Sequence, residues 1–225
     1  MGCSCSSWMR QFLCSSVGRK AVMAVTGVIL FLFIVGHLVG NLQVFLFDEG
    51  KALNSYAALL KSKPALLWGA RITMLFTVLV HIFTAVALWL ENRAARPTPY
   101  VFKRYREANY ASRTMIVSGP LIGLYVVYHL LHFTTGTVHP DFNSHEVYRN
   151  VILGFQNPAA AGVYIAAMLL LGTHLYHGLW SMCQSIGANH PKYNCLLTYG
   201  SAMIACVITL GYVSIPVSVL AGILK

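Results

Sequence analysis

Charged side chains are scarce in this sequence, and acidic ones are the scarcest. Asp, Glu, Lys and Arg make up 10% of its 225 residues, and six residues are acidic, whereas soluble domains contain about 25% charged residues. Hydrophobic residues make up 57% of the chain instead. Low-complexity tracts are absent, and the apolar runs leave no room for a soluble domain. The composition therefore excludes an ordinary soluble protein and indicates an all-α integral membrane protein.

The sequence also lacks the cysteine motifs that hold metals or haem. Its six cysteines form no Cys-x-x-Cys-His motif, so covalent haem attachment is not indicated, and their spacing is unlike that of a zinc site. We interpret them as reduced or buried thiols. A flavin site and a dicarboxylate site are likewise not visible in the chain.

Long apolar stretches are what the sequence does contain. Five of them come close to or exceed the roughly 20 residues that span a bilayer. Residues 1–20 are predicted to form a cytoplasmic N-terminal lead, whose Met-Gly-x-x-x-Ser opening matches a myristoylation pattern but is interpreted as unmodified. Residues 21–225 are predicted to form one transmembrane domain, with spans at about 21–46, 65–90, 114–135, 159–183 and 197–223.

The basic residues indicate how these spans are oriented. Ten Lys and Arg residues fall on the side of the N-terminus and six on the other side, and basic residues are enriched on the cytoplasmic side of membrane proteins. We therefore expect a cytoplasmic N-terminus and a C-terminus on the outer side. Because the charges flank the spans, the net charge of +10 is a topology signal, and no nucleic-acid partner is expected.

Histidines recur inside the spans, where an ionisable side chain is costly and usually functional. At about 1.5 Å rise per residue, His37 and His129 both lie about 22 to 24 Å from the cytoplasmic ends of spans one and three. His81 and His174 lie about 12 to 13 Å from the cytoplasmic ends of spans two and four. The first pair is therefore expected to meet near the outer face and the second pair near the inner face.

Two histidine pairs stacked across a membrane, one histidine from each of four helices, are typical of two b-type haems with two axial histidines each. The alternative is that each histidine is a buried packing residue with satisfied hydrogen bonds. Because the four histidines form two pairs at matching depths, we favour haem ligation over packing and expect a four-helix bundle with two haems.

Two further histidines leave the choice of ligands open, because residues three apart share a helix face. Thr26-Gly27 precedes His37 by the same interval as Ser118-Gly119 precedes His129, which favours His129 over His132. Small residues four positions after His81 and His174, Ala85 and Gly178, favour His174 over His177 because they could admit a flat ring. His132 and His177 are then alternative ligands, partners of the ligands, proton carriers or packing residues.

Several motifs together resemble one family over nearly the whole chain. The stretches GRKAVMAVTG, HLVGNLQVF, ENRAARP, SRTM, YHLLHFT and HxxxGLW, the last from His174 to Trp180, are similar to the cytochrome b subunit of type B succinate dehydrogenases and fumarate reductases. This resemblance implies a five-helix membrane anchor with two haems b that exchanges electrons with a quinone, menaquinone more than ubiquinone. It also implies the bacterial cytoplasmic membrane and two partners, a flavoprotein subunit and an iron–sulfur subunit.

The same resemblance implies roles for single residues. His37 and His129 would hold the outer haem, and His81 and His174 the inner haem. Inner-side Arg19, Lys20 and Arg113 are candidate contacts of the haem propionates. The lead and the 91–113 segment would face the iron–sulfur subunit, and the quinone would bind near the outer haem and the Asp48/Glu49 region. Catalysis on the dicarboxylate would occur on a partner subunit.

Other classes of protein use buried histidines too. The chain could be the two-haem anchor of another quinone-linked oxidoreductase, such as a hydrogenase or formate dehydrogenase. It could also be a haem-free transporter or proton channel, or a structural anchor without haem.

Overall fold

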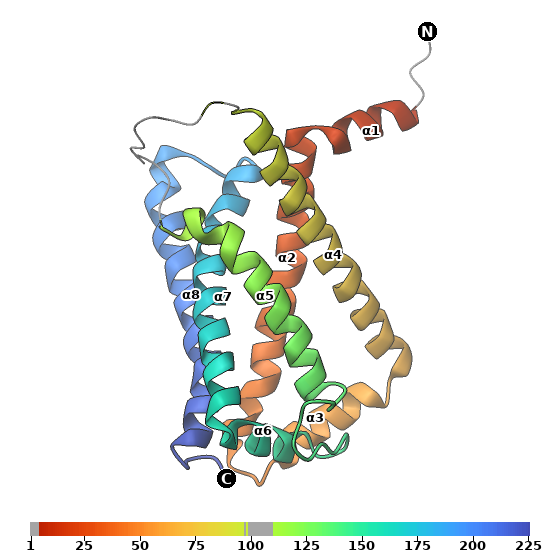
Figure 1. Cartoon of the computed structure of the whole chain (residues 1–225), viewed down its shortest axis with the longest axis vertical. Helices are drawn as coiled ribbons and strands as arrows, with labels where there is room; N and C mark the ends of the chain where they lie inside the picture. The colour runs from red at the N-terminus through yellow and green to blue at the C-terminus, as the bar shows by residue number, and fades with distance from the viewer. Residues whose placement is uncertain (1–4, 97, 99–109) are drawn as a thin grey trace.

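The computed structural model describes residues 5–96, 98 and 110–225, with side chains from residue 8 onward, and these residues are helical with short connections (Figure 1). The described part contains no strand. Its elements are α1 (Cys5–Cys14), α2 (Ser16–Asn41), the 3-10 helix η1 (Leu42–Leu46), α3 (Lys51–Lys61), α4 (Pro64–Ala94), α5 (Tyr110–Phe133), α6 (Val147–Gln156), α7 (Pro158–Ser185) and α8 (Pro191–Leu220).

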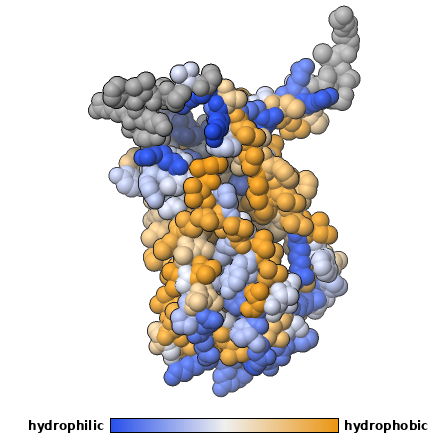
Figure 2. Space-filling model, viewed as in Figure 1, coloured by the Kyte–Doolittle hydropathy of each residue, from blue (hydrophilic) through white to orange (hydrophobic). Residues whose placement is uncertain are grey.

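Five helices in the described part are long and apolar enough to cross a membrane: α2 continued by η1, α4, α5, α7 and α8. Figure 2 shows a hydrophobic belt around their middle, with hydrophilic residues at the lower end. Large apolar side chains such as Leu32, Phe76 and Leu124 are exposed on this belt, which is where lipid would cover them. The expectation of an all-α membrane protein with five transmembrane helices is confirmed.

Each transmembrane helix overlaps one predicted span, and the differences lie at the ends. The first begins at Ser16 rather than 21, because the Ser15 side chain accepts a hydrogen bond from the Gly18 amide and caps the helix. The fifth begins at Pro191 rather than 197, where proline is favoured in a first helical turn. Polar caps extend these helices beyond the apolar runs from which the spans were predicted.

We call the two ends of the bundle upper and lower, as in Figure 1. The upper end carries α1, the start of α2 and the ends of α4 and α7, whereas α3, α6 and the C-terminus lie at the lower end. Neither α3 nor α6 was predicted, since each is short and only part of its surface is apolar. Both contribute to a buried lower cluster that includes Leu53, Ile152, Phe155 and Val219.

The transmembrane helices pack mainly in sequence-distant pairs. The most extensive contacts join α7 with α8, α2 with α4, and α5 with α7. Gly172 allows the close approach of α7 and α8. A Cβ atom at this position would lie 2.4 Å from Thr209 Oγ1. Among the described elements, only α2 and α3 pack extensively on α4. The α2–α4 pair and the α5–α7 pair are therefore the two sides of the bundle.

Candidate functional site

Two histidines from opposite sides of the bundle face each other in its lower half. The ring centres of His37 on α2 and His129 on α5 are 5.9 Å apart, with the ring planes at 82°. Phe33 stacks on His37 at 5.4 Å, and Tyr125 lies 5.9 Å from His129. We call His37 and His129 the lower pair.

A second pair lies in the upper half, again with one histidine from each side. The ring centres of His81 on α4 and His174 on α7 are 6.5 Å apart, with an interplanar angle of 56°. We call His81 and His174 the upper pair. Helical rise alone pairs the same residues, and their role as ligands stays a prediction.

Hydroxyl groups from the neighbouring helices contact both rings of the upper pair. Thr26 Oγ1 lies 2.9 Å from His81 Nδ1, and Ser118 Oγ lies 3.5 Å from His174 Nδ1. Both hydroxyl residues are buried, with exposed fractions of 7% and 2%. Each ring is thus engaged through Nδ1, which leaves Nε2 as the nitrogen available to a ligand.

A tyrosine joins the lower pair to a third histidine. The Tyr164 hydroxyl lies 3.2 Å from His129 Nδ1 and 3.1 Å from His132 Nδ1. Because it has one proton, it can donate to only one of these nitrogens and must accept from the other. If His129 binds a metal through Nε2, its Nδ1 is protonated and donates to Tyr164, which in turn donates to His132.

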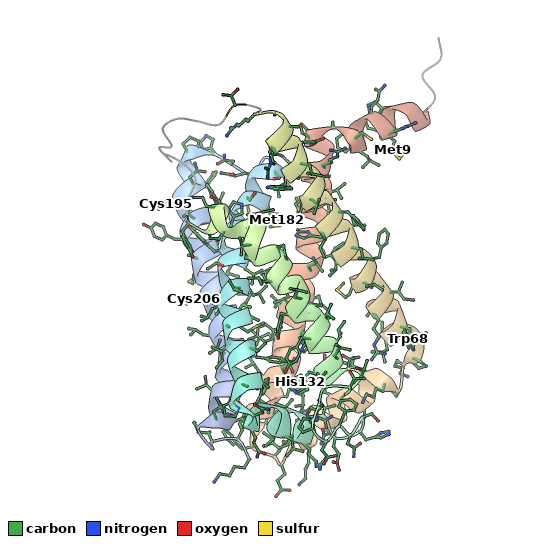
Figure 3. The ribbon with its side chains drawn as sticks, in the orientation of Figure 1. Met9, Trp68, His132, Met182, Cys195 and Cys206 are labelled. Carbon is green, nitrogen blue, oxygen red and sulfur yellow. The ribbon has the colours of Figure 1, made fainter. Side chains whose placement is uncertain are left out.

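His132 itself faces away from the space between the lower pair. It is the most buried histidine, with 1% of its surface exposed, and lies near the lower end of the bundle (Figure 3). Its ring packs against Phe133 at 4.2 Å, His139 at 5.1 Å and Tyr128 at 5.5 Å. Its nearly complete burial among these rings suits a packing residue better than an alternative ligand.

His177 is the other alternative ligand of the upper half. Its Nδ1 atom is buried and has no hydrogen-bond partner. The same is true of the Trp180 Nε1 atom, about one turn further along α7. A buried polar atom without a partner is rare in folded proteins. The upper pair nevertheless forms without His177, which stays a candidate partner of a bound group.

Small residues and partly exposed rings occur around both pairs. The four paired histidines are only half-buried although they lie inside the spans. A Cβ atom at Gly36, Gly119, Gly123 or Gly178 would meet nothing within 4 Å.

The separation within each pair also fits a shared metal ion. Two imidazoles that bind one metal ion from opposite sides, through bonds of about 2 Å, have ring centres about 6 Å apart. Both pairs are close to this value. The described residues contain no group of three or more His, Cys, Asp or Glu side chains that could hold a metal ion by themselves. The donor sets therefore fit two-histidine ligation of a haem iron, whose remaining ligands come from the porphyrin.

Comparison of the chain with protein families, curated proteins and solved structures finds no match. The functional assignment consequently depends on the residues and their geometry.

The basic residues expected at haem propionates lie at the upper end but differ in surroundings. Arg19 forms an ion pair with Glu91 of α4, whose second carboxylate oxygen is buried without a partner. Lys20 and Arg113 are exposed. Arg19 therefore joins α2 to α4 through this ion pair. In the described part of the chain, no contact of Arg19, Lys20 or Arg113 with the upper pair is seen, and their role at the propionates stays a prediction.

At the lower end, the two acidic residues near η1, Asp48 and Glu49, have different surroundings. Asp48 Oδ2 accepts a hydrogen bond from the Ala52 amide at the start of α3, while its Oδ1 atom is buried without a partner. Glu49 is exposed and lies 3.7 Å from Lys51. Asp48 is thus the better candidate for a proton-accepting group at this end.

The sequence does not predict the three side chains whose hydroxyl groups contact the paired histidines: Thr26, Ser118 and Tyr164. The signal for two of them was present, because Thr26 and Ser118 belong to the short repeat that precedes His37 and His129. In the sequence this repeat favours His129 as a ligand of the lower pair, whereas in the structure its hydroxyl groups contact the upper pair. Tyr164 has no such signal, because its role depends on how α5 and α7 pack.

Proposed function

We propose that this chain is the two-haem cytochrome b membrane anchor of a succinate:quinone oxidoreductase, a succinate dehydrogenase or fumarate reductase. The observation that carries the proposal is the presence of two separate histidine pairs, each at the spacing of two-sided ligation and each joining opposite sides of the bundle. The motif resemblance supports the class of enzyme. As a membrane subunit, the chain would belong to an enzyme whose dicarboxylate site is on another subunit.

In this proposal His37 and His129 hold one haem b, and His81 and His174 hold the other. When bound, the two haems supply one-electron carriers at two depths, between an iron–sulfur subunit and a membrane quinone. The chain's own residues orient the four imidazoles and exclude water. Phe33 and Tyr212, whose rings lie 5.4 and 6.3 Å from His37, contribute to that exclusion in the lower half.

The partners and the membrane follow from the same proposal. The upper end would face the bacterial cytoplasm, because Arg10, Arg19, Lys20, Arg93 and Lys192 all lie there and basic residues favour that side. The iron–sulfur and flavoprotein subunits would dock at this end, and the C-terminus would lie on the outer side. Part of the expected docking segment, residues 97 and 99–109, lies outside the described residues.

The quinone, menaquinone in preference to ubiquinone, would bind near the lower pair. Asp48 supports this location because its unpartnered Oδ1 atom is a buried acceptor close to the lower ends of the helices.

The first experiment is a dithionite-reduced minus air-oxidised spectrum of the purified membrane complex, combined with a pyridine haemochrome assay. We expect two haems b per chain and a covalent flavin in the co-purified partner. Two haems without a flavin partner would instead assign the chain to another quinone-linked oxidoreductase. No haem in a preparation that retains its partners would contradict the proposal and favour a haem-free transporter.

Histidine substitutions test the pairing. His37→Ala and His129→Ala should each remove the same haem, and His81→Ala and His174→Ala the other haem. His132→Ala and His177→Ala are matched controls on the same helices and should retain both haems. Loss in a different combination, or loss of a haem from either control, would refute the assigned ligands.

A further inference from the structure

The two helices that carry the lower pair also carry hydroxyl groups for the upper pair. Thr26 lies eleven residues before His37 on α2, and Ser118 lies eleven residues before His129 on α5. The hydroxyl oxygens of Thr26 and Ser118 contact the Nδ1 atoms of the upper pair at 2.9 and 3.5 Å. Each upper histidine is therefore held by the neighbouring helix of its own side of the bundle.

We propose that Thr26 and Ser118 are positioning residues that hold both upper histidines in the Nδ1-protonated form and thereby lower the reduction potential of the upper haem. This inference rests on the proposed function for its redox consequence. The tautomer itself is a property of the chain with or without haem.

The hydrogen bonds of Thr26 assign the protons. Its Oγ1 atom lies 2.8 Å from the Val22 carbonyl oxygen and 3.1 Å from that of Met23. Carbonyl oxygens only accept, so the single hydroxyl proton is directed to the helix backbone. Thr26 Oγ1 can then only accept from His81, which requires a proton on His81 Nδ1.

Ser118 is placed in the same way on α5. Its Oγ atom lies 3.5 Å from the Met115 carbonyl oxygen, three residues earlier in the helix, and 3.5 Å from His174 Nδ1. Both of these contacts are at the limit of hydrogen-bond length, so the effect at His174 is weaker than at His81. In both histidines a protonated Nδ1 leaves the Nε2 lone pair for the iron.

Because the two hydroxyl groups are buried, they alone can accept the hydrogen bonds from the Nδ1 atoms of the upper pair. Because Thr26 and Ser118 are almost completely buried, water cannot replace the hydroxyl oxygens as acceptors. A metal-bound imidazole that donates its other N–H to an acceptor is a more basic ligand. A more basic axial ligand stabilises the oxidised iron, so the upper haem should have a lower potential with these hydroxyls than without them.

The lower pair has other hydrogen-bond partners, so Thr26 and Ser118 should affect the potential of the upper haem only. There the acceptor for His129 is Tyr164, whose hydroxyl is shared with His132. Neither Thr26 nor Ser118 contacts this pair. Changes at the two hydroxyls should therefore act on one haem alone.

The test uses Thr26→Val and Ser118→Ala in the intact complex, with a redox titration that resolves the two haems. Thr26→Val is nearly isosteric, and we expect it to keep both haems and raise the potential of the upper haem only, by more than Ser118→Ala does. Thr26→Ser should restore the wild-type potential. Thr173→Val is the matched control, because this hydroxyl lies beside His174 in sequence but donates to the Leu170 carbonyl.

Each outcome bears on the inference. A raised potential of the upper haem, or selective loss of that haem with the lower one retained, supports it. An unchanged potential, an equal shift of both haems, or the same shift in Thr173→Val overturns it.

A second measurement separates this inference from the proposed function. In the full chain labelled with 15N-histidine, nitrogen chemical shifts report which ring nitrogen carries the proton. We expect Nδ1-protonated His81 and His174, assigned by single His→Gln variants, and a change at His81 in Thr26→Val. If the complex holds no haem, the proposed function fails while this result still decides the tautomer. Nε2-protonated His81 in the unsubstituted chain would overturn the inference.

Discussion

At the scale of single residues, spacing along a helix does not decide function. His129 and His132 lie three residues apart on α5 and both contact the Tyr164 hydroxyl. His129 faces His37 across the bundle, whereas His132 is enclosed by aromatic rings. A Cβ atom at Gly154 would lie 3.1 Å from His132 and 3.0 Å from Phe133, so α6 closes this side of the cluster.

Removal of the Tyr164 hydroxyl should destabilise the lower half of the bundle. Tyr164→Phe leaves the buried Nδ1 atom of His132 without its partner, and a buried unsatisfied group costs about 1–3 kcal/mol. Thermal unfolding of the purified protein would show this loss as a lower midpoint temperature. Tyr199→Phe is the control, because Tyr199 is 73% exposed and surface substitutions usually change stability by about 0.5 kcal/mol or less. Equal midpoints for the two variants would contradict the role given to Tyr164.

At the scale of helices, close contact between α7 and α8 depends on a glycine. The Thr209 side chain on α8 occupies the position that a side chain at Gly172 would need. The Thr209 hydroxyl donates a hydrogen bond of 2.7 Å to the Ala205 carbonyl oxygen. The absence of a Cβ atom therefore sets how closely these helices approach.

Gly172→Ala should destabilise the bundle although alanine is the better helix former. The added methyl group would meet Thr209 Oγ1 at 2.4 Å, and overpacking of this kind costs about 1–3 kcal/mol. Thr209→Ala in the same chain should recover most of the loss, which a double-mutant cycle of unfolding free energies would measure. Gly200→Ala on α8 is the matched control, since a Cβ atom there meets nothing within 4 Å. Additive effects of Gly172→Ala and Thr209→Ala would show that the two sites are not in contact.

The sequence predicted the transmembrane helices well because hydrophobic length is a local property. It also gave the depth of the histidines, since the rise per residue of a helix is nearly constant. It did not predict α3 and α6, whose stability depends on packing against the lower ends of α7 and α8. Nor did it reveal the hydroxyl contacts of His81, because Thr26 reaches that ring only through the packing of α2 on α4.

At the scale of the whole molecule, charge separates the two ends of the bundle. Glu91 is the one acidic residue among the basic residues of the described upper end, whereas the six basic residues of the lower end are accompanied by four acidic ones, Asp48, Glu49, Asp141 and Glu146. The proposed orientation, with the upper end in the cytoplasm, follows from this asymmetry.

Cysteine labelling tests that orientation directly. Cys195 lies at the upper end and is exposed, and Lys63 lies at the lower end and is exposed. In intact cells, a membrane-impermeant maleimide should label a variant whose only cysteine comes from Lys63→Cys. A variant that keeps only Cys195 should react after the membrane is opened. The reverse pattern would place the upper end outside and require the partner subunits at the other end.

The placement of Thr26 and His37 on one helix limits how this protein can change over time. Eleven residues make about three full turns, so both side chains point to nearly the same face, about 16 Å apart. Substitutions between them leave this register intact, whereas inserting or deleting one residue turns one group away from its partner by about 100°. The same holds for Ser118 and His129 on α5. The number of intervening residues in each helix is therefore fixed more strictly than the identity of those that contact neither pair.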